Sequence, residues 1–154
     1  MRRRIASTAI LAWVLAAASA SAADENRGYK EAGGLAVYLG VLPAAMVQGH
    51  QAHPEETMHG GVPRGRHAFH VLAAVFNAAS GERIEDAAVE ARVTPLGLAG
   101  VTRVLEPMTI AGTVTYGNYF AMSETDPYRI EFSITTAGAT RPVAVEFSYT
   151  HSAP

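Results

Sequence analysis

The sequence predicts an all-β protein of about seven antiparallel strands. Short runs rich in β-branched and aromatic residues recur along the chain, and turns that contain Gly, Pro or Ser separate them. No segment beyond the N-terminal region has the spacing of an amphipathic helix. Together these features are typical of an immunoglobulin-like β-sandwich that follows a signal peptide.

The N-terminus has the features of a secretory signal peptide. Three arginines follow Met1, an apolar stretch runs over residues 5–18, and small residues lead to Ala22. The apolar stretch is shorter than the ~20 residues that a membrane span needs. We therefore expect residues 1–22 to be removed by cleavage near Ala22, and residues 23–154 to work as a single domain in the periplasm.

The composition of the mature chain excludes some functions. Without the three N-terminal arginines, nine basic residues remain against 14 acidic ones, which lowers the formal net charge from −2 to −5. No basic patch remains, so a nucleic-acid partner is not expected. The chain has no cysteine, so any bound metal must be held by His, Met, Asp, Glu or Tyr.

The predicted strands rest on period-2 alternation and on the turns between the runs. Residues 66–77 are apolar on both alternating sets, which indicates a central strand that is covered on both sides. Residues 128–135 place Ile130, Phe132 and Ile134 on one face. The expected strands, in chain order, are 33–43, 66–77, 87–95, 101–108, 114–122, 128–135 and 142–150.

Residues 44–66 are predicted to form a long loop, because Gly, Pro and His occur throughout without a sustained period. Long loops in compact domains are usually functional or disordered. Imidazole nitrogen suits copper, zinc, iron and nickel, and thioether sulfur selects most strongly for Cu(I). The loop therefore supplies five candidate metal ligands, with copper first and iron as the alternative: Met46, His50, His53, Met58 and His59.

Three further candidate ligands are expected in or beside strands: His67, His70 and Met108. His67 and His70 are three residues apart, so in an ideal strand they point to opposite faces. They can share one metal ion only if the strand begins after His67 or bulges there. His70 as a core histidine and Met108 as a filler of the core remain alternatives. Tyr116 and Tyr119 are expected at the rim of the sandwich, and hydrogen bonding to a metal ligand is their alternative role.

Parts of the sequence resemble the periplasmic metal-binding proteins that accompany bacterial high-affinity iron permeases. The blocks that carry the resemblance are LAVYLGVLPAAM (35–46), RHAFHVLAAVFN (66–77), LEPMTIAGTVTYGNYFAM (105–122) and YRIEFSIT (128–135). The resemblance implies an immunoglobulin-like fold, a homodimer and a copper or iron ion held by His and Met. It places the family's metal-binding methionine at Met108 and its strand histidine at His67 or His70.

The sequence departs from the family pattern at three positions. Thr115 stands where the family has a second ligand histidine, and Gly112 stands where it has an acidic residue. Phe69 or Leu72 stands where the family has a carboxylate two residues after the strand histidine. The family site is therefore expected to be incomplete here. Either the loop histidines supply replacement ligands, or the chain is a divergent branch that has lost the site.

The leading prediction is a periplasmic protein that binds copper or iron and carries or delivers it to a transport system, such as a membrane permease or exporter. The alternative is a non-metal periplasmic binding or adaptor module that uses the sandwich surface. An enzyme is not expected, because the chain shows no nucleophile motif, acid–base pair or cofactor fingerprint, and GxSxG and HExxH are absent.

Overall fold

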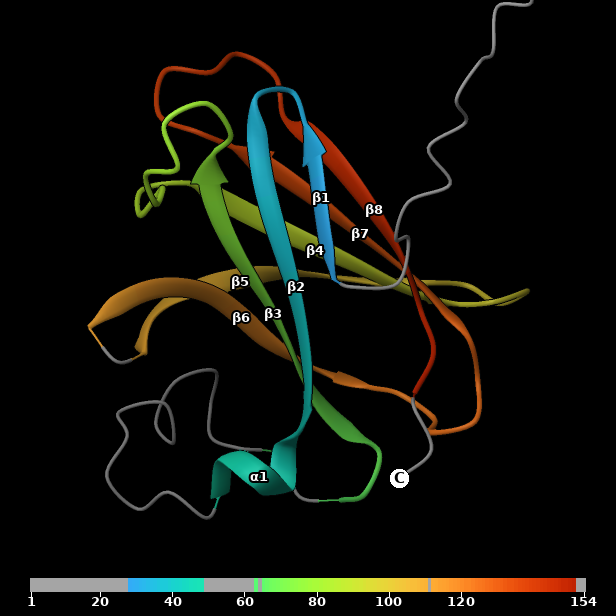
Figure 1. Ribbon diagram of the computed structural model, residues 1–154. Coiled ribbons are helices and arrows are strands. Elements are labelled where there is room, and N and C mark those ends of the chain that lie inside the picture. The colour runs from blue at the N-terminus through green and yellow to red at the C-terminus, as the bar shows by residue number, and fades with distance from the viewer. Residues whose placement is uncertain (1–27, 49–62, 64, 111, 152–154) are drawn as a thin grey trace, which may run out of the picture.

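The structure is a computed structural model that describes residues 28–48, 63, 65–110 and 112–151 (Figure 1). The predicted signal peptide, its cleavage site and residues 49–62 of the predicted loop lie outside these ranges. Among the described residues, no helix is long and apolar enough to cross a membrane.

The described chain is almost entirely β-structure, arranged as one antiparallel sheet in the order β1-β2-β3-β6-β5-β4-β7-β8. The all-β prediction is confirmed, and each of the seven expected strands has a counterpart. The eight strands are β1 (Tyr29–Ala32), β2 (Leu35–Pro43), β3 (Ala68–Asn77), β4 (Ala88–Pro95), β5 (Val101–Ile110), β6 (Thr113–Ala121), β7 (Tyr128–Thr135) and β8 (Val143–Tyr149).

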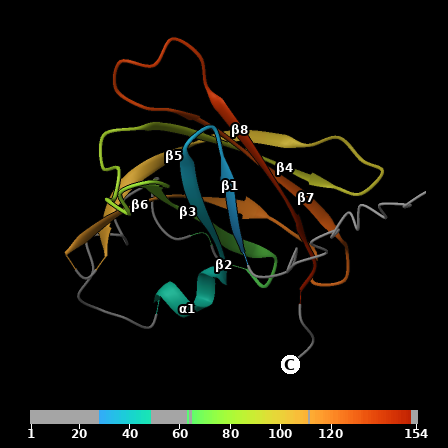
Figure 2. The same ribbon diagram turned by 45° about the horizontal axis from the view of Figure 1, so that its top comes forward.

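The sheet curls until it is nearly a barrel (Figures 1 and 2). Strand β5 connects the two parts of the curled sheet, because its first half pairs with β4 and its second half pairs with β6. The edge strands β1 and β8 then come into contact on the other side. The structure therefore shows one continuous curled sheet where the sequence predicted a two-sheet sandwich.

The main hydrophobic core fills the inside of the curled sheet. Strand β7 shows the pattern most clearly, since Ile130, Phe132 and Ile134 alternate with less buried residues and are each 0% exposed. On β3 the inward residues are Val71, Ala73 and Val75, which are also 0% exposed. The predicted alternation in these strands is confirmed.

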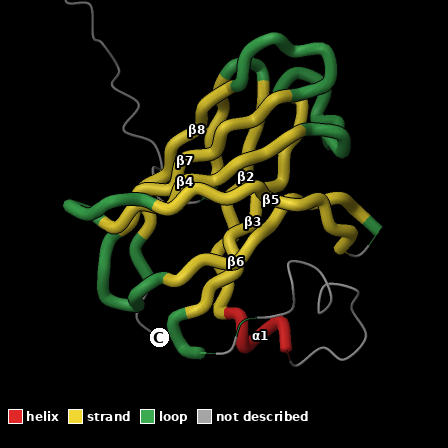
Figure 3. The backbone as a smooth tube through the Cα atoms, turned by 180° about the vertical axis from the view of Figure 1, so that it is seen from behind, coloured by secondary structure: helices red, strands yellow, loops and turns green. Residues whose placement is uncertain are grey.

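Two short elements differ from the expectations. Residues 29–32 form edge strand β1, which is not among the seven expected strands; an edge strand can keep polar and charged side chains. Residues Ala44–Gln48 form helix α1 where a loop was expected. Ala and Met are strong helix formers, and Pro43 ends the preceding strand. Figure 3 shows α1 at the end of the sheet where β2 ends, and the helix contacts β2 and β3.

Tyr116 lies in the core, although the sequence predicted it at the rim of the sandwich. Its side chain is 1% exposed. The hydroxyl accepts a hydrogen bond from the amide of Ala87 (2.9 Å) and donates one to the carbonyl of Ile84 (3.1 Å). Burial raises the pKa of the Tyr116 phenol. The residue thus ties β6 to the segment before β4.

Candidate metal centre

His70 lies on the face of β3 that points away from the main core. Strand β3 begins at Ala68, after His67, and the next residue, Val71, points into the core. In the sheet register His70 is opposite Leu42 on β2 and Tyr119 on β6. His70 is nevertheless only 1% exposed. It is thus a buried histidine on the outer face of the sheet, and both interpretations, metal ligand and buried structural histidine, remain predictions.

Met108 of β5 lies on the same outer face as His70. Residues that are directly paired across neighbouring strands, and residues two apart in one strand, share a face. Met108 pairs with Thr115 of β6, which is two residues from Gly117 and four from Tyr119, the partner of His70. Met108 is 2% exposed, yet it is not part of the main core cluster.

The side chains of His70 and Met108 converge on Gly117. A Cβ atom placed on Gly117 would lie 2.6 Å from Nε2 of His70 and 2.9 Å from Sδ of Met108. It would also lie 2.8 Å from Cδ2 of Leu72, which faces Gly117 across the β3–β6 pair. Only glycine lets a ring nitrogen, a thioether sulfur and a methyl group approach the backbone of β6 this closely.

Tyr119 stacks on the imidazole of His70. The two ring centroids are 4.5 Å apart and the planes are 24° from parallel. Tyr119 is 5% exposed and lies on the outer face with His70, so it is not a rim residue. Stacking of this kind restricts the rotation of the imidazole and holds Nε2 toward Gly117.

A nitrogen and a sulfur that face one space can bind a soft or borderline metal ion. Metal–nitrogen and metal–sulfur bonds in proteins are about 2.0–2.3 Å long. The Cβ point is one covalent bond from the Gly117 Cα, so an ion that joins Nε2 and Sδ would lie farther from the backbone, with both side chains adjusting around it. Within the described part of the chain, no group of three or more His, Cys, Asp or Glu could hold a metal ion.

The other predicted ligands are not brought to this space by the described residues. His67 is exposed at the entrance to β3, where its carbonyl accepts a hydrogen bond from the amide of Met122 (2.8 Å). Met46 is 60% exposed on α1. The remaining loop candidates lie outside the described residues: His50, His53, Met58 and His59.

The positions that depart from the family pattern border the same region. Thr115 is half-buried and directly opposite Met108. Gly112 lies in the β5–β6 turn with a φ of 79°, a left-handed conformation that favours glycine over an acidic residue. Leu72 occupies the position two residues after His70, and its methyl group borders the space at Gly117.

Sequence reasoning missed Gly117 and Leu72 as parts of this candidate site, and it placed Tyr119 beside a metal ligand only as an alternative. The signal for Gly117 was present, because an isolated glycine inside a strand often marks a close approach by another group. Leu72 and Tyr119 carried no such signal, since an apolar and an aromatic residue in a strand usually indicate packing.

The sixth histidine, His151, belongs to a different region. Its ring lies 4.4 Å from the ring of Phe69, which faces the core, and its Nδ1 is 3.1 Å from the hydroxyl of Tyr149. Burial lowers the pKa of His151, and the negative charge of Glu124 partly opposes this effect. His151 thus packs at the open end of the core and lies apart from the candidate metal centre.

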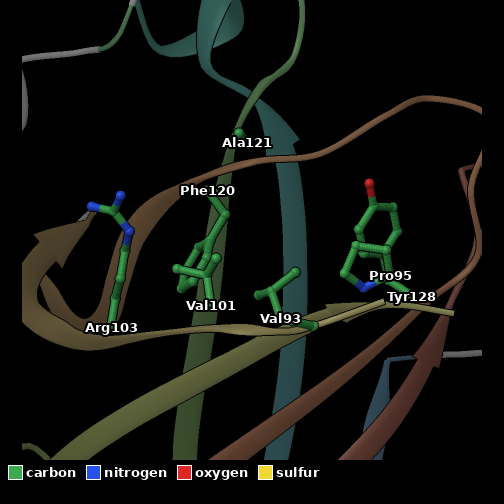
Figure 4. Close-up of a pocket in the computed structure, with 8 residues that line it drawn as sticks. Val93, Pro95, Val101, Arg103, Phe120, Ala121 and Tyr128 are labelled. Carbon is green, nitrogen blue, oxygen red and sulfur yellow. The ribbon is translucent and has the colours of Figure 1, made fainter. Parts of the chain in front are cut away.

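A pocket of about 130 Å³ is also separate from the centre (Figure 4). It contains no histidine or methionine, and Arg103 is its one charged residue. Figure 4 shows Val101 and Phe120 at its middle and Tyr128 at one side. The full lining is Val93, Pro95, Ala99, Val101, Arg103, Phe120, Ala121 and Tyr128.

Comparison with known proteins identifies the fold. No family model matches the chain, and no curated protein matches it in sequence. The fold is similar to that of a copper-bound variant of FetP from uropathogenic Escherichia coli strain F11, with a TM-score of 0.62 and 14% identity over 80% of this chain and 93% of that chain. Copper-reconstituted P19 from Campylobacter jejuni matches with a TM-score of 0.59 and 15% identity over 80% and 92% of the two chains.

A third similar structure comes from Pseudomonas aeruginosa PAO1. It is a DUF4426 family protein with a TM-score of 0.57 and 15% identity, over 81% of this chain and 95% of that chain. At such identities the likeness shows the fold alone. The chain therefore has the fold of FetP and P19, and the resemblance detected in the sequence is confirmed at that level.

Proposed function

We propose that this protein is an exported, periplasmic copper-binding protein that holds the ion through His70 and Met108. It binds and carries the ion and does not catalyse a reaction. Two solved structures with the same fold, FetP and P19, hold copper, which supports copper as the cargo. The signal-peptide features of residues 1–22 support export.

The observation that carries this proposal is the approach of two donor atoms to Gly117. Nε2 of His70 and Sδ of Met108 both lie within 3 Å of the point that a Cβ would occupy, at 2.6 and 2.9 Å. Two different donor atoms from strands that are far apart in sequence meet where the intervening strand has no side chain. A nitrogen and a sulfur this close to one backbone position are suited to share one ion beside Gly117.

The donor types favour copper over iron. A thioether is a soft ligand that binds copper well, whereas iron in sites without sulfur is usually held by imidazole and carboxylate together. In the described region the nearest carboxylate by register is Glu106, which is opposite Gly117 but exposed. Copper is therefore the proposed cargo, and iron is the weaker alternative.

Delivery follows from the resemblance and extends the proposal. We propose, from the resemblance, that the protein forms a homodimer and passes its ion to a membrane permease or exporter. The loop candidates Met46, His50, His53, Met58 and His59, together with His67, are proposed as additional ligands that complete the coordination.

The test is a copper titration of the purified protein and of two variants, His70→Gln and Met108→Leu. Met108→Leu conserves volume and is expected to change the free energy of unfolding by less than about 1.5 kcal/mol. Both variants are expected to bind copper much more weakly than the wild type, while thermal unfolding of the metal-free proteins confirms that they fold.

His67→Ala tests one of the proposed additional ligands, because this exposed histidine is three residues from His70. It is expected to change copper affinity less than His70→Gln. A wild-type protein that shows neither copper binding nor a copper-dependent rise in Tm would contradict the proposal and favour the non-metal adaptor.

A further inference from the structure

The inner face of strand β5 is buried near the middle of the strand and open at its start. Leu105 is 1% exposed in the core, whereas Val101, four residues earlier on the same face, is 53% exposed. Pairing of β5 with β6 begins only at Glu106, so the start of β5 is bound on the β4 side alone. The pocket of about 130 Å³ in Figure 4 lies here, between the start of β5 and Phe120 of β6. The inner face of the sheet can therefore be reached from outside at this pocket.

Arg103, the one charged residue of this pocket, lies on the inner face of β5. In the sheet register it is opposite Ala91, which is 0% exposed and belongs to the core cluster. Its guanidinium carbon lies 5.8 Å from the ring centroid of Phe120. Among the residues that the structure describes, Arg103 forms no hydrogen bond and no ion pair. The five N–H donors of its guanidinium are therefore available to a bound anion.

The other side chains that line the pocket are apolar, apart from the hydroxyl of Tyr128. That hydroxyl accepts a hydrogen bond from the amide of Ser123 (2.6 Å). In Figure 4 the hydroxyl and the guanidinium of Arg103 lie on opposite sides of Val101 and Phe120. No carboxylate lines the pocket, so its wall holds a positive charge without a negative one. The pocket thus joins a cationic end to an apolar middle.

The charge and the size of the pocket define the class of ligand that would fit. A guanidinium binds a carboxylate through two parallel hydrogen bonds, which a ligand without an anionic group cannot form. Apolar walls favour an apolar body, because its contact surface is removed from water. An apolar cavity of about 150 Å³ holds a benzene molecule, so this pocket suits a body of that size or smaller.

We propose that this pocket binds a small monocarboxylate whose apolar body is about the size of a benzene ring. Arg103 holds the carboxylate, and Val101 and Phe120 contact the apolar body. The lining contains neither His70 nor Met108, so this site is separate from the candidate metal centre. The inference therefore goes beyond the proposed function and does not depend on copper binding.

An NMR titration of the ¹⁵N-labelled, metal-free protein with sodium benzoate tests this inference. Benzoate combines the carboxylate with a ring of the right size, and it is expected to bind with a Kd of about 1 mM or lower. Benzyl alcohol keeps the ring but lacks the charge, and acetate keeps the charge but lacks the ring. Each of these two probes is expected to bind at least about tenfold more weakly than benzoate.

Three variants locate the binding. Arg103→Gln is expected to weaken benzoate binding by more than about tenfold and to leave the binding of benzyl alcohol nearly unchanged. Val101→Phe adds a ring where the apolar body would lie, and it is expected to weaken benzoate binding to a similar extent. Arg92→Gln is the matched control, because Arg92 is an exposed arginine of β4 that does not line the pocket; its effect is expected to be less than about twofold. Arg103 and Val101 are both exposed, so the variants are expected to fold, and their Tm values check this.

Each contrary outcome has a definite meaning. No binding of benzoate by the wild type up to about 10 mM would overturn the inference. Equal benzoate affinities of the wild type and Arg103→Gln would also overturn it. An equal loss in Arg103→Gln and Arg92→Gln would show a general effect of net charge and not a site. Copper affinity is expected to be unchanged in Arg103→Gln, so these outcomes leave the proposed function untouched.

Discussion

The two faces of strands β3 and β6 both contain buried side chains, but they differ in chemistry. On the inner face Val71 and Phe120 belong to a continuous apolar core. On the outer face His70 and Tyr119 stack, and His70 and Met108 approach Gly117. Apolar burial on the inner face stabilises the fold. The proposed copper site lies on the outer face, so substitutions on the two faces should change different properties of the protein.

The largest expected effect is loss of stability from an inner-face truncation. Phe132 is 0% exposed and contacts Phe147 at a centroid distance of 5.7 Å. Phe132→Ala should lower the free energy of unfolding by about 3–5 kcal/mol, measured by chemical denaturation. The protein that remains folded should keep its copper affinity. If Phe132→Ala lost copper affinity but kept its free energy of unfolding, the inner face would contribute to binding, and the distinction between the two faces would be wrong.

Adding a side chain at Gly117 should have the next largest effect, a loss of copper affinity. Gly117→Ala places a Cβ between His70 and Met108, so copper affinity should fall by about a hundredfold or more, equivalent to about 2.7 kcal/mol. The three atoms that the new Cβ meets are all side-chain ends that can shift, so the fold should survive.

Gly40→Ala is the matched control for this substitution. Gly40 lies on the same face of the sheet, but its added Cβ would meet Leu72 Cβ at 3.3 Å and no proposed donor atom. Copper titration measures the affinities of the two variants, and Gly40→Ala is expected to bind copper more tightly than Gly117→Ala. Equal affinities of Gly117→Ala and Gly40→Ala would show that the space at Gly117 does not hold the ion.

Removing the ring that stacks on His70 should weaken binding by a smaller factor. Tyr119→Leu should lower copper affinity by about tenfold, or 1.4 kcal/mol, because the imidazole becomes free to rotate. Tyr119→Phe keeps the ring and should bind copper almost as well as the wild type. If the Phe variant binds as weakly as the Leu variant, then the hydroxyl and not the ring supports the site.

The smallest expected effect concerns His151, at the open end of the core. Its pKa is lowered because burial disfavours the charged form, so protonation favours the unfolded chain. The stability that neutral His151 contributes is present above pH 6.5, the usual histidine pKa, and is lost as the pH falls from there toward the lowered value. Glu124 opposes the shift, while Tyr128 and Tyr149 pack against the ring.

Metal-free unfolding measured between pH 7.5 and pH 5 tests this effect. His151→Phe should flatten the decrease in the free energy of unfolding relative to the wild type. His67→Ala, at an exposed histidine, is the control substitution. An unchanged slope in His151→Phe would mean that His151 does not contribute to the acid sensitivity of the fold.

Much of the fold could be predicted from the sequence because β-strands leave a local pattern. The alternation of Ile130, Phe132 and Ile134 predicted the strand Tyr128–Thr135 with the bounds that the structure has. The edge strand β1 and the helix α1 were missed, since both are short and depend on their neighbours. The closure of the sheet through β5 could not be predicted, because pairing between distant strands has no local signal.

The candidate site was predictable only in part. The sequence predicted imidazole and thioether as the donor types and named His70 and Met108 among the candidates; that they bind a metal stays a prediction. The register brought them together: His70 is opposite Tyr119, and Met108 is opposite Thr115. Register depends on long-range pairing, so the meeting of these donors at Gly117 required the structure.

The central claim is that one imidazole and one thioether bind the same copper ion at Gly117. X-ray absorption spectroscopy of the Cu(I)-loaded protein tests it most directly. We predict a nitrogen ligand and a sulfur ligand, with a copper–sulfur distance of about 2.3 Å that is lost in Met108→Leu. A spectrum without sulfur, or a sulfur signal that persists in Met108→Leu, would contradict the claim.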